Sequence, residues 1–302
     1  MANYDFDVIC VGCGHGCDLA ARILARAGKK VAAVERDLWM GTCTNYGCNA
    51  KIMLDGPFEL TTAMENYREI GVFDKVPEVN WEKLMQYKMP YFEAYKPFTK
   101  ATMEQSGCTC IHGHGTLKDA HTVVVDGQDY TAENVILGPG ERDHLRTSLC
   151  HWRCHRQAHP QTDTHRFLRE PVPADLIMGK TTEPICYPAV PNLVFTFPRI
   201  AQVGVSLDEA RKDSKYRVVD IPYGQAFLFN THNEATDKLA FIFDNESNLL
   251  VGAAAMGSDA GPWIDVLSLV IFNKMTREQL AYYIYAFPTT TCGPLMMLGM
   301  FW

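Results

Sequence analysis

The feature that most constrains the fold is a glycine-rich turn near the N-terminus. Phe6 to Val11 is an apolar run typical of a buried strand, and Gly12, Gly14 and Gly16 follow it directly. Leu19 to Ala27 then has the composition and the period of a helix. A turn of this kind between a strand and a helix restricts the backbone to a small number of folds.

The next segment extends this pattern to a complete supersecondary unit. Gly28 can end the helix, and Lys30 to Glu35 predicts a second strand. Strand, turn, helix and strand in this order form a βαβ unit, which begins a parallel, doubly wound sheet. We therefore expect an α/β fold.

The turn also predicts a ligand. Glycines let the backbone approach a pyrophosphate, which then lies at the N-terminus of the helix. Glu35, about 20 positions further along, is placed to bind a ribose hydroxyl. Cys17 stands at the third glycine position, where a side chain crowds the contact between helix and strand. The alternative is a plain βα turn that binds nothing.

A pair of cysteines follows the βαβ unit, in the run Gly41-Thr42-Cys43-Thr44-Asn45-Tyr46-Gly47-Cys48. Two cysteines separated by four residues can close a disulfide within one helical turn, and such a pair can carry out thiol–disulfide exchange. Two alternatives remain open, a pair of small core residues or half of a metal site. The metal interpretation needs further ligands, and none follow nearby.

The rest of the first half is less distinctive. Residues 57–110 have a mostly helical pattern. Thr122 to Val125 and Gln128 to Tyr130 predict a hairpin around Asp126-Gly127. Val135 to Leu137 predicts another buried strand.

The C-terminal part predicts an α+β arrangement, in which strands are mixed with helices. The predicted strands are Leu193 to Thr196, Leu239 to Phe243 and Leu249 to Ala254, and the predicted helices are Ile264 to Phe272 and Arg277 to Tyr285.

Length and charge restrict the class of protein. A chain of 302 residues is long enough for about two domains. A net charge of -7 argues against a nucleic-acid partner. No run reaches the roughly 18 apolar residues of a membrane span, and the N-terminus lacks the pattern of a signal peptide. We therefore expect a cytoplasmic protein without a membrane partner, in which a close cysteine pair indicates redox chemistry or metal binding.

These motifs together resemble a known family. The run G-T-C-x-N-x-G-C, one strand downstream of the glycine turn, is similar to the redox-active segment of the pyridine nucleotide-disulfide oxidoreductases, the family of glutathione reductase, dihydrolipoamide dehydrogenase and mercuric reductase. The resemblance covers residues 4–140, ending where Val135 to Gly140 looks like the family's strand that ends in A-T-G. It resumes at Asp175, and Pro191 to Gly204 resembles the opening of the family's dimerisation domain.

The resemblance implies a domain organisation and an activity. Residues 1–140 would form a doubly wound, Rossmann-like FAD-binding domain, residues 141–174 an irregular junction, and residues 175–302 an α+β dimerisation domain. The activity would be FAD-dependent oxidoreduction, with a dithiol/disulfide relay between the flavin and Cys43-Cys48. The substrate would be a small-molecule or protein disulfide, and the partner a second copy of the chain.

The resemblance also assigns roles to single residues. Cys48 would lie beside the flavin and Cys43 would exchange with the substrate. The residues expected to bind FAD are Gly12, Gly14, Gly16, Glu35, Gly41, Thr42, Lys51, Gly115 and Gly140.

Three departures from the family pattern bear on activity. The family's lysine near the flavin falls at Ile52, one position after Lys51. Phe287 and Cys292 stand where the family has its catalytic histidine and the supporting glutamate, and phenylalanine carries no proton. Residues 141–174 replace a second dinucleotide-binding domain of on the order of 100 residues, so the NAD(P)H site expected of the family lacks its domain. We therefore expect impaired activity, and the alternative is a non-catalytic remnant that binds flavin weakly or only dimerises.

The junction contains a cluster of metal-binding residue types. Cys150 to His155 has the pattern C-x-x-x-C-H, which is one residue too long for haem attachment. Clustered ligands alone do not make a tetrahedral zinc site, so we predict no metal.

A shifted reading frame explains the junction better. We read the sequence from Cys150 in a shifted frame, in which the last two bases of each codon are joined to the first base of the next. The allowed codons then include A-I-G-D-V-I-D-K. The start of this peptide matches A-x-G-D, the family's second flavin motif. The continuation to Pro173 can be read as H-T-P-K-L-T-P-T-A-F-F-E-S-Q-Y-L. We interpret residues 150–173 as an out-of-frame segment, and the alternative is a divergent exposed loop.

Overall fold

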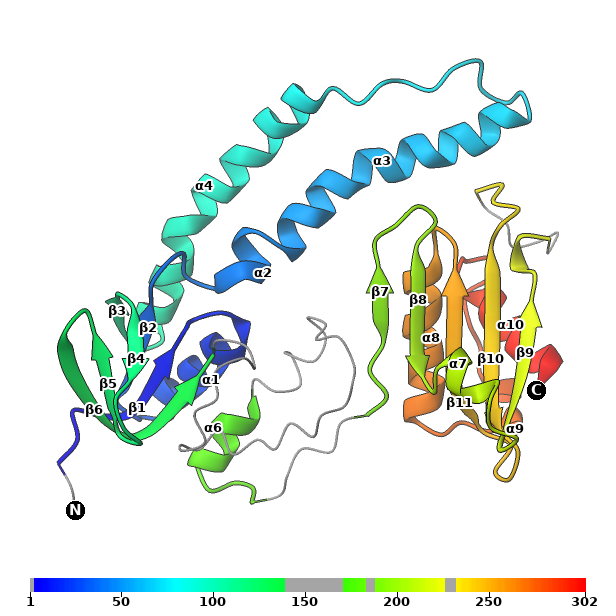
Figure 1. Cartoon of the computed structure of the whole chain (residues 1–302). Helices are drawn as coiled ribbons and strands as arrows, with labels where there is room; N and C mark the ends of the chain where they lie inside the picture. The colour runs from blue at the N-terminus through cyan, green and yellow to red at the C-terminus, as the bar shows by residue number, and fades with distance from the viewer. Residues whose placement is uncertain (1–2, 139–170, 183–187, 226–231) are drawn as a thin grey trace. The chain divides into compact units, whose positions relative to one another are not determined.

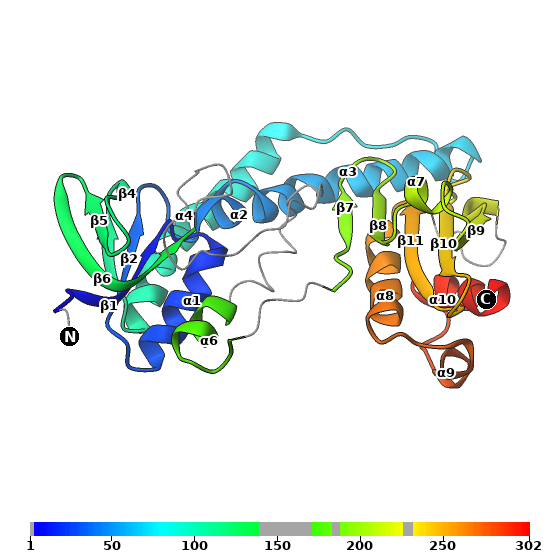
Figure 2. The ribbon, with the colours of Figure 1, turned by 60° about the horizontal axis from the view of Figure 1, so that its bottom comes forward.

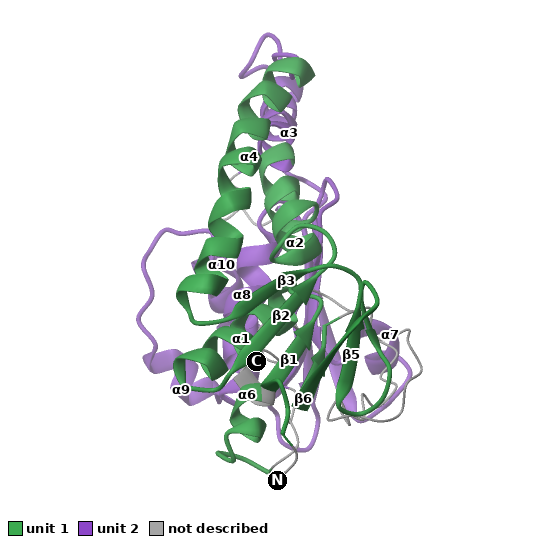
Figure 3. Cartoon of the chain, turned by 90° about the vertical axis from the view of Figure 1, so that its left-hand side faces the viewer, with its two compact units in different colours: residues 1–54, 80–186 green, residues 55–79, 187–302 purple. Residues whose placement is uncertain are grey.

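The computed structural model describes residues 3–138, 171–182, 188–225 and 232–302 (Figure 1). Gly140, the Cys150 to His155 cluster and, up to residue 170, the segment that we interpret as out of frame lie outside the described residues. The chain divides into two compact units (Figure 3): residues 1–54 with 80–186 form unit 1, and residues 55–79 with 187–302 form unit 2. The predicted domain limits at residues 140 and 174 stay predictions.

Unit 1 contains a six-stranded sheet in the order β3-β2-β1-β6-β5-β4. The strands are β1 (Phe6–Val11), β2 (Val31–Glu35), β3 (Thr109–His112), β4 (Gly115–Leu117), β5 (Thr122–Val125) and β6 (Gln128–Leu137). β1 pairs in parallel with β2 and β6, and β2 pairs in parallel with β3. β5 pairs antiparallel with β4 and β6. The predicted α/β class with a doubly wound sheet is confirmed, and β3, β2, β1 and β6 form the parallel part of this mixed sheet.

The βαβ unit forms as its sequence predicts. Every residue of β2 is buried, and α1 (His15–Arg26) packs Ala20, Ala21 and Leu24 into the core. The helix ends in a Schellman motif. Gly28 has φ +87°, and the Lys29 amide donates to the Leu24 carbonyl at 3.1 Å.

The predicted hairpin is confirmed, but the separate strand after it is wrong. Asp126 and Gly127 have φ of 47° and 88°, as a two-residue type I′ turn requires. Val135 to Leu137 is the end of β6, a single strand of ten residues. The first part of β6 pairs with β5 and the second part with β1, so one strand joins the hairpin to the parallel sheet.

Three helices follow β2, namely α2 (Gly41–Asn45), α3 (Cys48–Glu69) and α4 (Trp81–Gln105). The Asn80 side chain caps α4 by accepting a hydrogen bond from the Lys83 amide. The helical pattern predicted up to Cys110 stops earlier, because Ser106 ends α4 and Thr109 begins β3. Further along, α6 (Pro171–Ile177) packs against α1 through the buried Ala174.

Unit 2 contains a five-stranded antiparallel sheet in the order β7-β8-β11-β10-β9. The strands are β7 (Asn192–Val194), β8 (Ile200–Gly204), β9 (Tyr216–Ile221), β10 (Lys238–Asp244) and β11 (Leu250–Met256). α8 (Ala260–Phe272) packs against β8 and β11 (Figure 2). The remaining helices are α7 (Leu207–Ala210), η1 (Tyr223–Gln225), α9 (Arg277–Tyr282) and α10 (Cys292–Phe301). The predicted α+β arrangement is confirmed, although α9 ends at Tyr282 and not at Tyr285.

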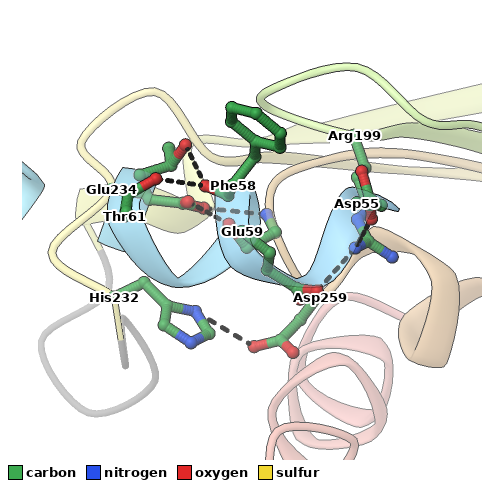
Figure 4. Close-up of polar contacts among 10 residues, drawn as sticks. Asp55, Phe58, Glu59, Thr61, Arg199, His232, Glu234 and Asp259 are labelled. Atoms are coloured by element: carbon green, nitrogen blue, oxygen red, sulfur yellow. Dashed lines mark hydrogen bonds and ion pairs between the residues drawn. The ribbon is translucent and has the colours of Figure 1, made fainter. Parts of the chain in front are cut away.

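A largely buried arginine, Arg199, fixes the part of α3 that belongs to unit 2. Nη2 of Arg199 lies 2.6 Å from an Asp55 carboxylate oxygen and 2.7 Å from one of Glu59 (Figure 4). The guanidinium also lies over the Phe195 ring, 4.8 Å from its centroid. Among the described residues, no helix has the length and apolar character needed to cross a membrane.

Candidate redox and flavin site

The glycine turn leaves the N-terminus of α1 open. Gly12 has φ +82°, a conformation that favours glycine, and its amide donates to the Val34 carbonyl at 2.8 Å. Gly14 precedes the helix and contributes no capping side chain. A Cβ atom at Gly16 would meet nothing within 4 Å among the described residues. The turn therefore has room for an anionic group beside the first backbone amides of α1.

Glu35 is held at the edge of this turn. One carboxylate oxygen accepts a hydrogen bond from the Cys13 amide at 2.8 Å, and the other accepts from the Asp37 amide at 2.9 Å. The side chain is buried. Each oxygen can accept a second hydrogen bond, so the carboxylate remains able to bind a ribose hydroxyl.

Cys17, at the third glycine position, is accommodated by Gly138. The Cys17 sulfur lies between β1 and β6, 4.0 Å from the Val11 carbonyl oxygen and 3.9 Å from that of Ile136. A Cβ atom at residue 138 would come within 2.8 Å of this sulfur and still closer to the Gly12 carbonyl oxygen. Glycine at residue 138 therefore leaves room for both the Cys17 sulfur and the Gly12 carbonyl group.

The two cysteines of the redox segment are joined by a disulfide. Cys43 lies in α2 and Cys48 is the first residue of α3, with their Cα atoms 4.9 Å apart. The prediction that the pair can form a disulfide is confirmed. Cys43 is 8% exposed and Cys48 is half-buried.

The other residues of the run shape the loop around the disulfide. The Asn45 side chain donates to the carbonyls of Trp39 and Gly41, at 2.9 and 2.8 Å, and so closes α2 on itself. A Cβ atom at Gly47 would come 3.2 Å from the Thr42 carbonyl oxygen, which accepts the Gly47 amide at 2.7 Å. These two structural roles explain the N-x-G spacing, and the sequence analysis did not identify them.

The redox segment packs directly on the glycine turn. Gly14 and Met40 form an isolated parallel bridge. A Cβ atom at Gly41 would come 2.8 Å from the Gly14 Cα, so the two backbones meet through two glycines. Nε2 of His15 lies 3.1 Å from the Thr44 hydroxyl oxygen, at hydrogen-bond distance. No sequence pattern points to this pair, because 29 positions separate its members.

The other predicted cofactor residues are spread around this core. Thr42 and Lys51 are exposed, in α2 and α3. Gly115 begins β4, and a Cβ atom there would lie 3.0 Å from methyl groups of both Val11 and Val34. The predicted role of each in binding FAD stays a prediction.

Four other thiols of unit 1, those of Cys10, Cys13, Cys108 and Cys110, are poor nucleophiles. A hydrogen bond with Cys17 and burial raise the pKa of Cys10 well above its usual value, and burial does the same for Cys13. Burial raises the pKa of Cys108 to about 12 and that of Cys110 to about 11. These thiols stay protonated at neutral pH. In the described part of the chain, no group of three or more His, Cys, Asp or Glu side chains is arranged to hold a metal ion.

The position of the family's catalytic base lies in unit 2. Phe287 is 63% exposed. Cys292 is fully buried, and its sulfur lies 3.1 Å from the Thr289 carbonyl oxygen. Phe287 has no ionisable group, and the Cys292 thiol is buried.

Comparison with known proteins agrees with this geometry. The sequence model described as pyridine nucleotide-disulphide oxidoreductase matches residues 6–162, and the model of that family's dimerisation domain matches residues 190–294. Glutathione reductase from Pisum sativum is 29% identical over 46% of this chain and 27% of its own length. Glutathione reductase from Nostoc sp. is 30% identical over 46% of this chain and 30% of its own length. The chain therefore matches less than a third of either relative.

A solved structure shares the fold across both units. It is a mutant of the HOCl-induced flavoprotein disulfide reductase RclA from Escherichia coli, in a Cu(II) complex, with a TM-score of 0.75. The match covers 99% of this chain and 100% of that one at 12% sequence identity, a similarity of fold alone. With a family model matching more than half of its residues, the chain belongs to the pyridine nucleotide-disulphide oxidoreductase family.

Proposed function

We propose that the chain binds FAD and uses the Cys43–Cys48 disulfide as a redox relay for oxidoreduction of a disulfide substrate. The observation that carries this proposal is the position of the disulfide. Its segment packs on the glycine turn through Gly14 and Gly41, so a dinucleotide on the turn and the sulfurs share one site.

The residues present fit FAD. The open first turn of α1 suits the pyrophosphate, and the Glu35 carboxylate is oriented by two backbone amides for a ribose hydroxyl. Gly12 and Gly14, with Glu35, would hold the adenosine half, and Thr42 and Lys51 would lie near the flavin end. Gly16, Gly41 and Gly115 complete the proposed set, together with Gly140, which lies outside the described residues.

We assign different roles to the two sulfurs. Bound FAD supplies an acceptor and donor for an electron pair. With two electrons and two protons, the disulfide becomes two thiols, and the Cys43 thiolate can then attack a substrate disulfide and release one substrate thiol. Cys48 would attack the mixed disulfide and release the second. The burial of the two residues does not select between them, so this order rests on the family resemblance.

The assembly and the setting are also proposals. Residues 190–294 match the family's dimerisation domain, which supports a homodimer. We propose a small-molecule or protein disulfide as substrate and a cytoplasmic location. The domain limits that we propose remain 1–140, 141–174 and 175–302.

A second candidate is a flavin-binding remnant without turnover. Phe287 favours it, because its exposed ring cannot protonate a departing thiolate as the family's histidine does. The remnant would bind FAD and dimerise but would not reduce a disulfide substrate.

Anaerobic titration with dithionite separates these candidates. After reconstitution with FAD and desalting, the wild-type chain should take up about four electrons per bound flavin, two for the flavin and two for the disulfide. A variant carrying both Cys43→Ser and Cys48→Ser should take up about two electrons, and Cys110→Ser, which changes a partly buried thiol elsewhere, should match the wild type. A chain that binds no FAD, or equal uptake with and without the two cysteines, would refute the relay. Uptake of four electrons without turnover of any disulfide would favour the remnant.

A further inference from the structure

We propose that His15 is a positioning residue for the Cys43–Cys48 pair, acting through Thr44. The inference rests on the proposed redox function of this pair. It assigns a role to the His15 side chain, at the cofactor-binding turn, that glycine or alanine at this position could not perform.

The two side chains meet at the junction of the turn and the redox segment. His15 is the first residue of α1 and is half-buried. Thr44 follows Cys43 in α2 and is 3% exposed. The 3.1 Å contact between Nε2 of His15 and the Thr44 hydroxyl joins them directly.

A buried hydroxyl makes this contact energetically significant. Leaving a buried polar group unpaired costs more than a typical hydrogen bond contributes, because the group has lost its contact with water. Removing His15 alone leaves the buried Thr44 hydroxyl without this hydrogen bond, and that loss carries the cost. Removing both groups together avoids it. The two side chains should therefore behave as a coupled pair.

The short helix α2 depends on such contacts. It has five residues, from Gly41 to Asn45, and a helix of this length is not stable by itself. Contacts with the glycine turn support it, among them the Gly14–Met40 bridge, the close approach of Gly14 and Gly41, and the bond between His15 and Thr44. Because neighbouring Cα atoms are about 3.8 Å apart, a shift of Thr44 moves Cys43 as well.

The position of Cys43 in turn biases the redox equilibrium. A disulfide needs its Cα atoms about 4.4 to 6.8 Å apart. The observed separation of 4.9 Å lies in this range. After reduction the sulfurs are free to separate, and a helix held in place keeps Cys43 beside Cys48. The contact between His15 and Thr44 therefore favours the disulfide over the dithiol.

The test measures this equilibrium in the whole chain without any need for turnover. The reaction is protein dithiol plus oxidised dithiothreitol, giving protein disulfide plus reduced dithiothreitol. After equilibration and acid quenching, free thiols are alkylated, and mass spectrometry quantifies the peptide that contains Cys43 and Cys48. Because only this peptide is quantified, the redox state of the other cysteines does not affect the measurement.

The variants form a double-mutant cycle with conservative controls. His15→Ala and Thr44→Val should each shift the equilibrium about three- to tenfold toward the dithiol, as expected for loss of one hydrogen bond. The double variant should shift no further than the single ones. His15→Gln and Thr44→Ser keep a polar partner and should stay within about twofold of the wild type. His114→Ala removes an exposed imidazole elsewhere in unit 1 and should have no effect.

Three results would overturn the proposal. One is a His15→Ala equilibrium equal to that of the wild type, another is full additivity in the double variant, and the third is failure of His15→Gln to restore the equilibrium. If Thr44→Val does not fold, comparison of His15→Ala with His15→Gln decides, because both change a half-buried side chain. Failure of the proposed redox function is a separate outcome. In that case the dithionite titration shows no electron uptake by the disulfide, and this result does not depend on the equilibrium with dithiothreitol.

Discussion

At the scale of single residues, the contact between Cys17 and Gly138 carries a prediction about stability. Gly138→Ala should lower the free energy of unfolding by about 1 to 3 kcal/mol, because the added methyl group meets the Cys17 sulfur and the Gly12 carbonyl. Adding Cys17→Ala should restore part of this loss, since the sulfur is removed while the carbonyl remains. Urea unfolding followed by circular dichroism measures both effects. Gly16→Ala is the matched control, because its Cβ atom meets nothing, and a loss there equal to that of Gly138→Ala would contradict this explanation.

A buried carboxyl pair in unit 2 carries a prediction about pH. Burial and the neighbouring Glu234 carboxylate raise the pKa of Asp237 to about 9. Burial opposes ionisation of Glu234, but hydrogen bonds from Asp237 and Ser258 outweigh it and lower the pKa of Glu234. At neutral pH, Asp237 is therefore protonated and Glu234 is ionised.

The sign of the pH effect follows from proton binding. Between the unfolded pKa of an aspartate, about 4, and the folded value, the folded chain holds one proton more at Asp237 than the unfolded chain does. This contribution to stability is therefore fully present below about pH 4 and is lost as the pH rises toward 9. Asp237→Asn keeps a donor to Glu234 but has no proton to lose, so its urea midpoint should fall less between about pH 6 and pH 9 than that of the wild type. Parallel pH profiles for the two proteins would exclude a protonated Asp237.

At the scale of elements, the ion pairs of Arg199 hold the part of α3 that belongs to unit 2, residues 55–69, and breaking them should destabilise this unit. Arg199→Met leaves Asp55 and Glu59, one helical turn apart, without their shared cation. Asp55 and Arg199 are 11% and 12% exposed, so the loss should be about 2 to 4 kcal/mol. Arg211→Met breaks an exposed pair with Asp220 and should cost less than about 1 kcal/mol. Thermal melting of both variants tests this difference, and equal losses would show that the buried pairs do not anchor the helix.

The elements that could be predicted from the sequence are those with local signals. β1, α1 and β2 follow from an apolar run, a helical period and a terminating glycine, and the hairpin follows from Asp126-Gly127. The continuity of β6 has no local signal, because its two parts differ only in which strands they pair with. In the site, the spacing of Cys43 and Cys48 permitted a disulfide, and the family resemblance favoured it over a pair of core residues or half of a metal site. The contact between His15 and Thr44 depends on tertiary packing, which no local pattern encodes.

At the scale of the whole molecule, the two family matches leave little chain between them. They cover residues 6–162 and 190–294, so residues 163–189 separate them. The family resemblance expects a second dinucleotide-binding domain in this region, and such a domain needs on the order of 100 residues. We therefore expect a single glycine-rich dinucleotide turn in this chain, the one at Gly12 to Gly16, which we propose for FAD.

This organisation predicts that NADH and NADPH do not reduce the bound flavin at a useful rate. Hydride transfer requires the nicotinamide to be held against the flavin ring, and such positioning contributes on the order of 7 to 11 kcal/mol to lowering the barrier. Dithionite needs no binding site, so it should still bleach the flavin within the mixing experiment. Stopped-flow absorbance of the FAD-reconstituted chain compares the reductants directly, with a complete glutathione reductase as the positive control. Rapid bleaching by micromolar NADH or NADPH would mean that this chain binds the nicotinamide through residues outside any second glycine-rich turn.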